Sequence, residues 1–386
     1  MVKQYDIAII GAGASGLMAA CTALRRGKSV VVLEMGNLPA RKLAVSGGGN
    51  CNITNTDANY TRYFGKNPEF VRGALARFSP YSILDWAEKH KIKLYEKTSG
   101  RYFCSDGANV VVDALMKDAK DATFMWNEKV LDITRDNDLF LIQSDTTIVY
   151  AKSVIIATGG VSFPTLGVSE TGYKIAKKFG HKIIPVCPGL CGLVIAKAVS
   201  DFAGISVNAQ IQIGKYKIND DLLFTHFGLG GPLAYRTSMY DLNDGFTINL
   251  KPNLNIYEIL KNTKQTDGRK KIASVLSEYI PMRIAKYIVK NSVQNIADIK
   301  DDELRKIADN VQNIYISGTD IKRHGLSSAE VVRGGISTDE ISSKTMESKL
   351  CKGLFFAGEA IDIAGDLGGF NLQWAWASGF VAGSNA

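Results

Sequence analysis

The segment YDIAIIGAGASGLMAACTALRRGKSVVVLE, residues 5–34, decides the fold of this chain. The apolar run at residues 5–10 predicts a buried strand, and apolar side chains at helical spacing over residues 17–24 predict a helix. A second apolar run, residues 29–33, predicts another strand that ends at Glu34. The turn between the first strand and the helix has the spacing G-x-G-x-x-G, and this arrangement is typical of a Rossmann dinucleotide-binding unit.

The three glycines of this turn each have a mechanical role in holding a pyrophosphate. Gly11 permits the tight turn, Gly13 lets the backbone contact the phosphates, and Gly16 lets the helix lie close to the strand. The start of the helix adds unpaired N–H donors and positive dipole charge. Glu34 is placed to accept hydrogen bonds from the adenosine ribose, and an acid there favours FAD or NAD over NADP. The alternative is a tight turn of the same shape without a ligand.

A second glycine-rich segment, RKLAVSGGGNCNITN at residues 41–55, follows this unit. Its three successive glycines favour a loop in which the backbone wraps a ligand, and Arg41 and Lys42 could offset pyrophosphate charge. The alternative is a flexible surface loop. Residues 151–160 then predict a buried strand that ends in A-T-G-G.

The C-terminal part of the chain returns to the pattern of a strand followed by a glycine turn. Residues 353–362 predict a buried strand ending in G-E-x-x-D, and residues 366–379 predict a glycine turn that enters an apolar helix. We expect the N–H groups at the start of that helix to face the N1/O2 edge of a flavin. The alternative is a core helix without a ligand, and Trp374 and Trp376 are core residues on either interpretation.

Length and composition indicate the number of lobes, the location of the protein and the charge of its partners. The 386 residues exceed what one core usually organises, so we expect two or more lobes. No apolar window is long enough to cross a membrane, and the N-terminus lacks a secretory signal. The six cysteines are scattered without metal-ligand spacing, which favours reduced thiols, a cytoplasmic protein and no metal site. The net charge of +8 is compatible with an anionic partner.

The central part of the chain, from about residue 191 to residue 333, does not continue the Rossmann rhythm. Its first half predicts strands at residues 205–213, 215–218 and 246–250, because polar and apolar side chains alternate there. Its second half predicts helices at residues 257–262, 268–279, 281–290 and 301–311.

Motifs spread along the chain resemble those of one flavoprotein family. They are R-K-L, S-G-G-G and C-N in residues 41–52, A-T-G-G and S-F-P in residues 157–164, L-F-T-H-F-G in residues 223–228, and G-G-F-N-L-Q in residues 368–373. In this order they resemble the BaiN/RdsA family of FAD-dependent oxidoreductases, in the glutathione-reductase-like superfamily, over nearly the whole chain. Asn50 stands where that family usually has arginine, and Ala40 where it usually has glycine, so no role of that arginine transfers.

The resemblance implies an FAD-binding domain split by an insertion that covers the flavin, and it implies reduction of carbon–carbon double bonds. Activities of the family include making dihydrouridine in large-subunit (23S) ribosomal RNA and reducing unsaturated bile-acid intermediates, and a related branch oxidises aminoacetone. The expected α/β fold is a Rossmann-like FAD-binding domain in two parts, residues 1–190 and 334–386, with an inserted β-rich module, residues 191–255, and an inserted helical module, residues 256–333.

The residues predicted to contact FAD come from the glycine turn, the second glycine segment and the later strand ends, together with Val130. They are Gly11, Gly13, Ala14, Ser15, Gly16, Glu34, Arg41, Lys42, Leu43, Ser46, Gly47, Gly48, Gly49, Asn50, Val130, Thr158, Gly159, Gly358, Glu359, Asp362, Gly369, Phe370, Asn371 and Leu372.

A basic stretch in the inserted region is a candidate surface for RNA. Residues 261–290 hold eight basic side chains against Asp267 and Glu278, a local charge of +6, which could hold RNA phosphates. The alternative is a solvated, lysine-rich helix surface. The ribosomal RNA branch of the family favours RNA, whereas no interleaved aromatic platform or known RNA-binding module is visible. The candidate residues are Lys261, Lys264, Arg269, Lys270, Lys271, Arg283, Lys286 and Lys290.

A flavin carries out hydride transfer itself, and the protein must supply a proton on the opposite side of the substrate. Cys51, His226 and Tyr102 are the candidate donors. Each also has a structural alternative: Cys51 as a small packed residue, His226 as a brace for its loop, and Tyr102 as a cover over the flavin. No second G-x-G-x-x-G follows a strand, so we expect NADH or NADPH to bind only transiently as the reductant.

Three functions stay open on these grounds. The first is NAD(P)H-dependent reduction of uridine in ribosomal RNA. The second is a small-molecule flavoenzyme, either an ene-reductase or an aminoacetone-type amine oxidase. The third is a flavin-binding redox sensor without turnover.

Overall fold

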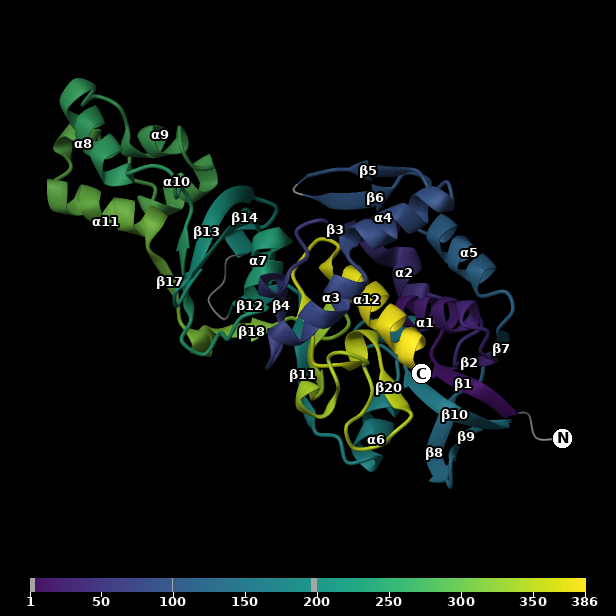
Figure 1. The fold of residues 1–386 in the computed structure, drawn as a ribbon. Helices are drawn as coiled ribbons and strands as arrows, with labels where there is room; N and C mark the ends of the chain where they lie inside the picture. The colour runs from purple at the N-terminus through teal and green to yellow at the C-terminus, as the bar shows by residue number, and fades with distance from the viewer. Residues whose placement is uncertain (1–3, 99, 196–199) are drawn as a thin grey trace. The chain divides into compact units, whose positions relative to one another are not determined.

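The computed structural model describes residues 4–98, 100–195 and 200–386, and the chain forms two compact units. The first, which we call the Rossmann unit, comprises Met1–Pro188 and Glu330–Ala386. The second, the inserted unit, comprises Gly189–Ala329. Figure 1 shows the elements of each unit, which are described separately below.

The Rossmann unit is built on a sheet with the strand order β7-β2-β1-β10-β9-β8, in which β20 also pairs with β10. Strands β7, β2, β1, β10 and β20 are parallel, whereas β9 and β8 continue the sheet antiparallel. The runs IAII in β1 and VVVL in β2 are wholly buried, as parallel strands covered on both faces should be. The strands are β1 Gln4–Ile10, β2 Val30–Glu34, β7 Thr123–Trp126, β8 Val130–Asp136, β9 Leu139–Ser144, β10 Ile148–Ile156 and β20 Leu354–Phe356.

Helices α1 (Ala14–Arg25) and α12 (Phe370–Asn385) pack along each other (Figure 1). Their backbones approach closely, because a Cβ atom on Gly379 would lie 2.3 Å from the carbonyl oxygen of Ser15. The indole N–H groups of Trp374 and Trp376 donate to the carbonyls of Gly358 and Ile53 at 3.1 and 2.9 Å. Both indoles are buried, which confirms their predicted place in the core.

Smaller elements surround this framework and complete the Rossmann unit. A three-stranded sheet has the order β3-β6-β5, and two-stranded sheets join β4 to β21 and β11 to β19. The capping box of Ser79 and Ser82 starts α4, whose Pro80 suits the first helical turn. The elements are α2 Arg41–Val45, β3 Asn52–Asn55, β4 Tyr63–Phe64, α3 Arg72–Arg77, α4 Pro80–Lys89, β5 Leu94–Glu96, β6 Arg101–Cys104, α5 Asn109–Asp118, α6 Thr171–Lys178, β11 Ile183–Gly189, β19 Val331–Ile336 and β21 Ala364–Gly365.

The inserted unit has its own antiparallel sheet and its own apolar core. The strand order is β17-β16-β13-β14-β15-β12-β18, and the long hairpin of β13 and β14 carries the alternating pattern read from the sequence. The strands are β12 Leu193–Ile195, β13 Ser206–Ile213, β14 Tyr216–Phe224, β15 Gly228–Gly230, β16 Phe246–Asn249, β17 Ile314–Ile316 and β18 Ile321–Arg323. The helices are α7 Gly231–Thr237, α8 Ile256–Thr266, α9 Ile272–Ser277, α10 Met282–Ile288 and α11 Asp301–Gln312.

The division of the insertion into a β-rich part and a helical part stays a prediction, and the structure differs from it in detail. Strands β17 and β18 lie in the stretch expected to be helical but belong to the sheet, and α7 lies in the stretch expected to be strands. Three residues are too few to show an alternating pattern, so β17 and β18 have no signal of their own in the sequence. None of the helices in the described parts of the chain has the length and apolar character needed to cross a membrane.

Candidate functional site

The carboxyl ends of three parallel strands meet at one edge of the Rossmann sheet. Ile10 of β1 pairs with Ile156 of β10, and Ile156 pairs with Phe356 of β20. The N–H groups of the next residues, Ala157 and Ala357, donate to the carbonyls of Ile10 and Ile156 at 2.9 and 3.0 Å. This register brings together the glycine turn, the A-T-G-G turn and the G-E-x-x-D turn, at the edge where α/β sheets bind nucleotides.

The glycines of the first turn divide into two roles. Gly11 has φ +106°, and a Cβ atom there would lie 2.6 Å from the carbonyl oxygen of Ala157. A Cβ atom on Gly16 would lie 2.0 Å from the carbonyl oxygen of Gly11, so both glycines are needed by the protein's own packing. A Cβ atom on Gly13 would meet nothing within 4 Å, and no described side chain caps the start of α1 at Ala14. Space and free N–H donors therefore remain beside Gly13 for an anionic ligand.

Glu34 braces the glycine turn through its carboxylate. Oε2 accepts a hydrogen bond from the Ala12 N–H at 2.8 Å, and Oε1 accepts one from the Gly36 N–H at 2.9 Å. The Arg41 guanidinium lies 3.3 Å from Oε1 and also donates to the Gly167 carbonyl at 3.4 Å. Glu34 thus acts on the shape of the loop, and its predicted contact with a ribose stays a prediction.

Lys42 joins two of the predicted cofactor segments. Its Nζ donates to Ser162 Oγ at 2.7 Å and to Glu359 Oε2 at 2.6 Å, while Glu359 Oε1 accepts from the Val332 N–H at 2.9 Å. Leu43, the next residue, is buried. The R-K-L segment and the G-E-x-x-D segment therefore lie against each other although the chain separates them widely.

The second glycine segment forms a left-handed loop between α2 and β3. Gly47, Gly48 and Gly49 have φ values of +59°, +68° and +89°, a region that side chains with a Cβ atom rarely occupy. Ser46 Oγ donates to the Leu43 carbonyl at 2.7 Å, which ties the loop to α2. Asn50 is exposed, and its carbonyl accepts from the Cys104 N–H at 2.9 Å. The backbone of this loop is thus held open by glycine and can follow a ligand.

The later strand ends supply further groups at the same edge. Thr158 Oγ1 is buried, and no hydrogen bond from the described residues satisfies it. Gly358 donates its N–H to Ser378 Oγ at 2.9 Å, and Asn371 bridges both backbone groups of Gly365 at 2.7 and 2.9 Å. Burial raises the pKa of the Asp362 carboxyl, which accepts from the Lys66 N–H at 3.0 Å.

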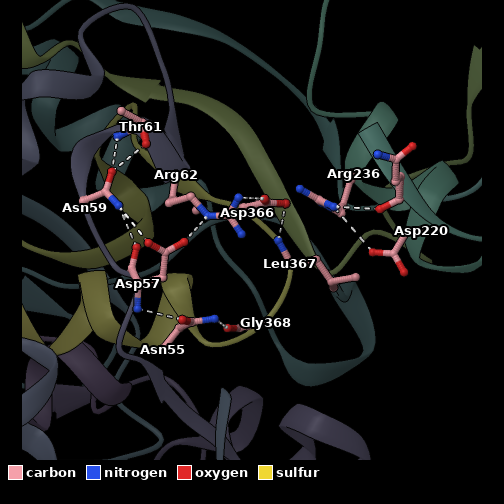
Figure 2. A network of polar contacts seen from close by, with 12 residues as sticks. Asn55, Asp57, Asn59, Thr61, Arg62, Asp220, Arg236, Asp366, Leu367 and Gly368 are labelled. Carbon is pink, nitrogen blue, oxygen red and sulfur yellow. Dashed lines mark hydrogen bonds and ion pairs between the residues drawn. The ribbon is translucent and has the colours of Figure 1, made fainter. Parts of the chain in front are cut away.

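The turn before α12 is set by a polar network that the sequence analysis missed. Figure 2 shows Arg62 between two carboxylates, with Nε 3.3 Å from Asp57 and Nη1 3.4 Å from Asp366. Asn55 Nδ2 donates to the Gly368 carbonyl at 2.9 Å. These contacts hold Gly369 (φ +92°), the N-cap of α12, in place before Phe370 and Leu372. The cluster of Asn and Asp in residues 55–59 was the available signal, since such residues favour turns.

The residues just described fit an FAD molecule. The free N–H groups of α1 and the space beside Gly13 suit a pyrophosphate. The Thr158 hydroxyl at the same strand edge has no hydrogen-bond partner among the described residues, and a bound cofactor would provide one. Val130 is the first residue of β8 and is buried. Its predicted contact with FAD stays a prediction.

The candidate proton donors fall in both units. Cys51 is wholly buried beside Cys104, and their hydrogen bond raises the pKa of Cys51 while it lowers the pKa of Cys104. Tyr102 donates to Glu96 Oε2 at 3.3 Å, and the charge of Glu96 raises the pKa of Tyr102. Cys51 and Tyr102 thus lie at the β3-β6-β5 sheet, whereas His226 is exposed between β14 and β15 of the inserted unit.

In the folded protein, acidic side chains offset part of the positive charge of the basic stretch at residues 261–290. Lys264 Nζ lies 2.8 Å from Asp301 of α11, and Lys270 pairs with Glu278 at 3.3 Å. Arg283 Nε donates to the Asp201 carbonyl at 3.0 Å. Residues 256–312 together hold 11 basic and 8 acidic side chains, a net charge of +3. The exposed members are Arg269, Lys270, Lys271, Arg283, Lys286 and Lys290, and Lys261 lies 6.0 Å from the Tyr257 ring.

The described ranges hold no group of three or more His, Cys, Asp or Glu side chains placed to bind a metal ion. All six cysteines are free thiols.

Known relatives match the chain from end to end. Ribosomal RNA dihydrouridine synthase of Escherichia coli is 35% identical over 394 residues, which cover 98% of this chain and 97% of that protein. The protein of the same name from Haemophilus influenzae is 36% identical over 401 residues, 98% of each chain. The 3-dehydro-bile acid delta(4,6)-reductase of Clostridium scindens is 28% identical over 406 residues, again 98% of each.

A family model described as the HI0933-like protein Rossmann domain matches residues 5–385. The predicted Rossmann-type fold and the predicted oxidoreductase class are confirmed by this match and by the full-length relatives. The resemblance read from the motifs is confirmed by these relatives, and the chain belongs to the HI0933-like family.

Proposed function

We propose that this flavoprotein oxidoreductase uses FAD and NAD(P)H to reduce a carbon–carbon double bond, and that its substrate is uridine in large-subunit ribosomal RNA. The observation that carries the proposal is the end-to-end match to two ribosomal RNA dihydrouridine synthases at 35% and 36% identity. The intact strand edge with its free N–H donors supports it, because this chemistry needs a bound dinucleotide. A cytoplasmic location belongs to the same proposal.

The chain's own residues would bind and orient the cofactor. When bound, FAD supplies the hydride chemistry that no side chain can perform. The start of α1 and the backbone of Gly13 would hold its phosphates, and the Lys42–Glu359 ion pair would keep the two cofactor segments together. The loop of Gly47 to Gly49 would follow the ligand with its backbone, and Thr158 would gain its missing hydrogen bond.

Reduction of a uracil double bond also needs a proton for the second carbon. Cys51 lies next to the glycine loop, and its raised pKa keeps it a neutral thiol, the form from which a proton can be given. Tyr102 is the second candidate, because its hydroxyl stays protonated beside Glu96. The exposed basic residues of the inserted unit, such as Lys286 and Lys290, would contact RNA phosphates.

A second candidate function is reduction of an unsaturated small molecule. The match to the bile-acid reductase at 28% identity over 98% of the chain favours it. The charge of only +3 over residues 256–312 is compatible with it as well, since a free metabolite needs no extended basic surface.

Deletion of the gene, followed by mass spectrometry of dihydrouridine in the host's large-subunit ribosomal RNA, tests the proposal. The host must have this modification there and no second synthase. We expect the modification to disappear and to return with the wild-type gene or a Tyr315→Ala control, but not with Gly13→Ala. Unchanged dihydrouridine would overturn the RNA substrate. Reduction of an unsaturated steroid by the purified protein with NADH or NADPH would then favour the second candidate.

A further inference from the structure

We propose that a pocket of the Rossmann unit formed by Tyr60, Arg72 and Tyr81 binds an unpaired nucleobase of single-stranded RNA. The proposal rests on the proposed function, because the RNA would be the substrate of the reaction proposed above. It adds a binding surface outside the cofactor edge and outside the basic stretch of the inserted unit. No aromatic platform is visible in the sequence, because these three residues come from different elements.

The pocket lies among the 3-10 turn Tyr60–Arg62, α3 and the start of α4. Its volume is 380 Å³, within the usual range of small-molecule sites. Leu75 and Pro80 provide apolar walls, and both are buried. The pocket is shallow and open to solvent, so it is suited to a flat group that packs one face against these walls.

Two planar groups are presented to that space. The Arg72 guanidinium lies 3.8 Å from the centroid of the Tyr60 ring, which is a stacked cation–π contact. The Tyr81 ring is 63% exposed, although it lines the pocket. Arginine planes and tyrosine rings are the groups on which unpaired bases stack. A paired base is already stacked within its helix, so this arrangement selects single strands.

Charge complementarity points to a nucleic acid as the occupant. Four exposed lysines lie at or after the C-terminal end of α4, namely Lys89, Lys91, Lys93 and Lys97. Residues 56–104 hold nine basic and five acidic side chains, so this segment carries +4 of the net charge of +8. The ten residues of α4 span about 15 Å, a distance that a few nucleotides cover between the pocket and the lysines. A base in the pocket and phosphates on the lysines would use both features.

Fluorescence anisotropy with a labelled single-stranded oligouridine, using the full-length protein with its FAD, tests the site. Tyr81→Ala should weaken binding about 5- to 150-fold, the range for loss of one base–aromatic stack. Arg72→Lys should also weaken it while leaving the salt dependence nearly unchanged, because the charge stays and the plane is lost. Tyr315→Ala, 61% exposed on β17, is the matched control and should bind like wild type.

The proposal would be overturned if Tyr81→Ala and Arg72→Lys both bound the oligouridine as tightly as the wild-type protein does. It would also be overturned if the wild-type protein bound an acidic tyrosine-containing peptide but no single-stranded RNA. Thermal unfolding and the flavin spectrum establish that the variants are folded. The proposed function fails separately: if the deletion strain keeps its dihydrouridine while Tyr81→Ala loses RNA binding, the site stands and the assigned reaction does not.

Discussion

Lys42 Nζ lies 2.6 Å from Glu359 Oε2 although 317 residues separate the two in the chain. This ion pair joins the two parts of the split Rossmann unit, one before and one after the inserted unit. Ser162 and the backbone of Val332 complete its hydrogen bonds. The pair therefore links chain segments that the insertion could otherwise separate.

We expect Lys42→Met and Glu359→Gln each to lower the free energy of unfolding by about 1–2 kcal/mol, because the pair is partly buried and each change leaves a polar partner unsatisfied. The double variant should lose less than the sum. Urea denaturation in a double-mutant cycle measures this coupling. The exposed pair Lys174–Glu170 is the control and should show a coupling near zero. Full additivity at Lys42 and Glu359 would contradict the structural role.

Gly13→Ala and Gly16→Ala should have opposite consequences. A methyl group on Gly13 enters open space, so the apoprotein should stay folded, but FAD affinity should fall at least about tenfold because the phosphates approach there. A methyl group on Gly16 meets the Gly11 carbonyl at 2.0 Å, and the cost should be about 2–4 kcal/mol of stability. Apoprotein melting and FAD titration separate the two effects. Equal FAD affinity in Gly13→Ala would argue against the assigned phosphate site.

Cys51→Ala and Tyr102→Phe identify the proton donor. The variant that lacks the donor should reduce substrate about 10²- to 10⁴-fold more slowly, whereas NAD(P)H should still bleach the flavin at the wild-type rate. Cys51→Ala should also raise the pKa of Cys104, since the hydrogen bond from Cys51 lowers it. Single-turnover kinetics and thiolate absorbance measure these effects. Cys187→Ala on β11 serves as the control, and normal turnover in both donor variants would exclude both candidates.

Charge reversal at Lys286 and Lys290 tests the surface of the inserted unit. Each side chain is exposed, so Lys286→Glu and Lys290→Glu should leave the fold intact. If the residues contact RNA phosphates, each reversal should weaken rRNA binding and reduce the slope of log K against log salt by about 1. Lys174→Glu in the Rossmann unit is the control. Unchanged slopes would mean that RNA does not use this face.

The carboxylate of Asp6, on β1, should make the stability of the Rossmann unit depend on pH. Its carboxylate accepts from Lys152 Nζ at 2.8 Å and from Ser29, and these bonds hold its pKa well below the ordinary value of 3.8. The pKa of Asp6 is lower in the folded protein than in the unfolded chain. Ionised Asp6 therefore stabilises the fold fully above pH 3.8, and this stabilisation is lost as the pH falls through the pKa of the folded protein. Asp6→Asn should cost about 1–2 kcal/mol at neutral pH and progressively less in acid. Urea unfolding across this range checks the trend, and a pH-independent difference would contradict it.

The Rossmann unit could be predicted from residues 5–34 because its signal is local. A strand, a glycine turn and a helix follow one another within 30 residues, and each has a periodicity that a short window reveals. Gly11 has a positive φ and Gly16 approaches the Gly11 carbonyl within this same segment, whereas the close approach of Gly11 to the Ala157 carbonyl depends on β10. The same reasoning predicted β13, the first part of β14, β16 and the helices α8 to α11 of the inserted unit, whereas it missed α7.

Contacts between distant segments were decided by the tertiary structure. The partner of Lys42, the bond from Asn55 to Gly368, and the pocket of Tyr60, Arg72 and Tyr81 leave no spacing pattern in the chain. Neutralisation of Lys264 by Asp301 likewise arises because α8 and α11 pack together. Local motifs thus determine the type of fold and cofactor site, whereas surface charge, braces and the additional pocket depend on which side chains the fold brings within a few ångströms of each other.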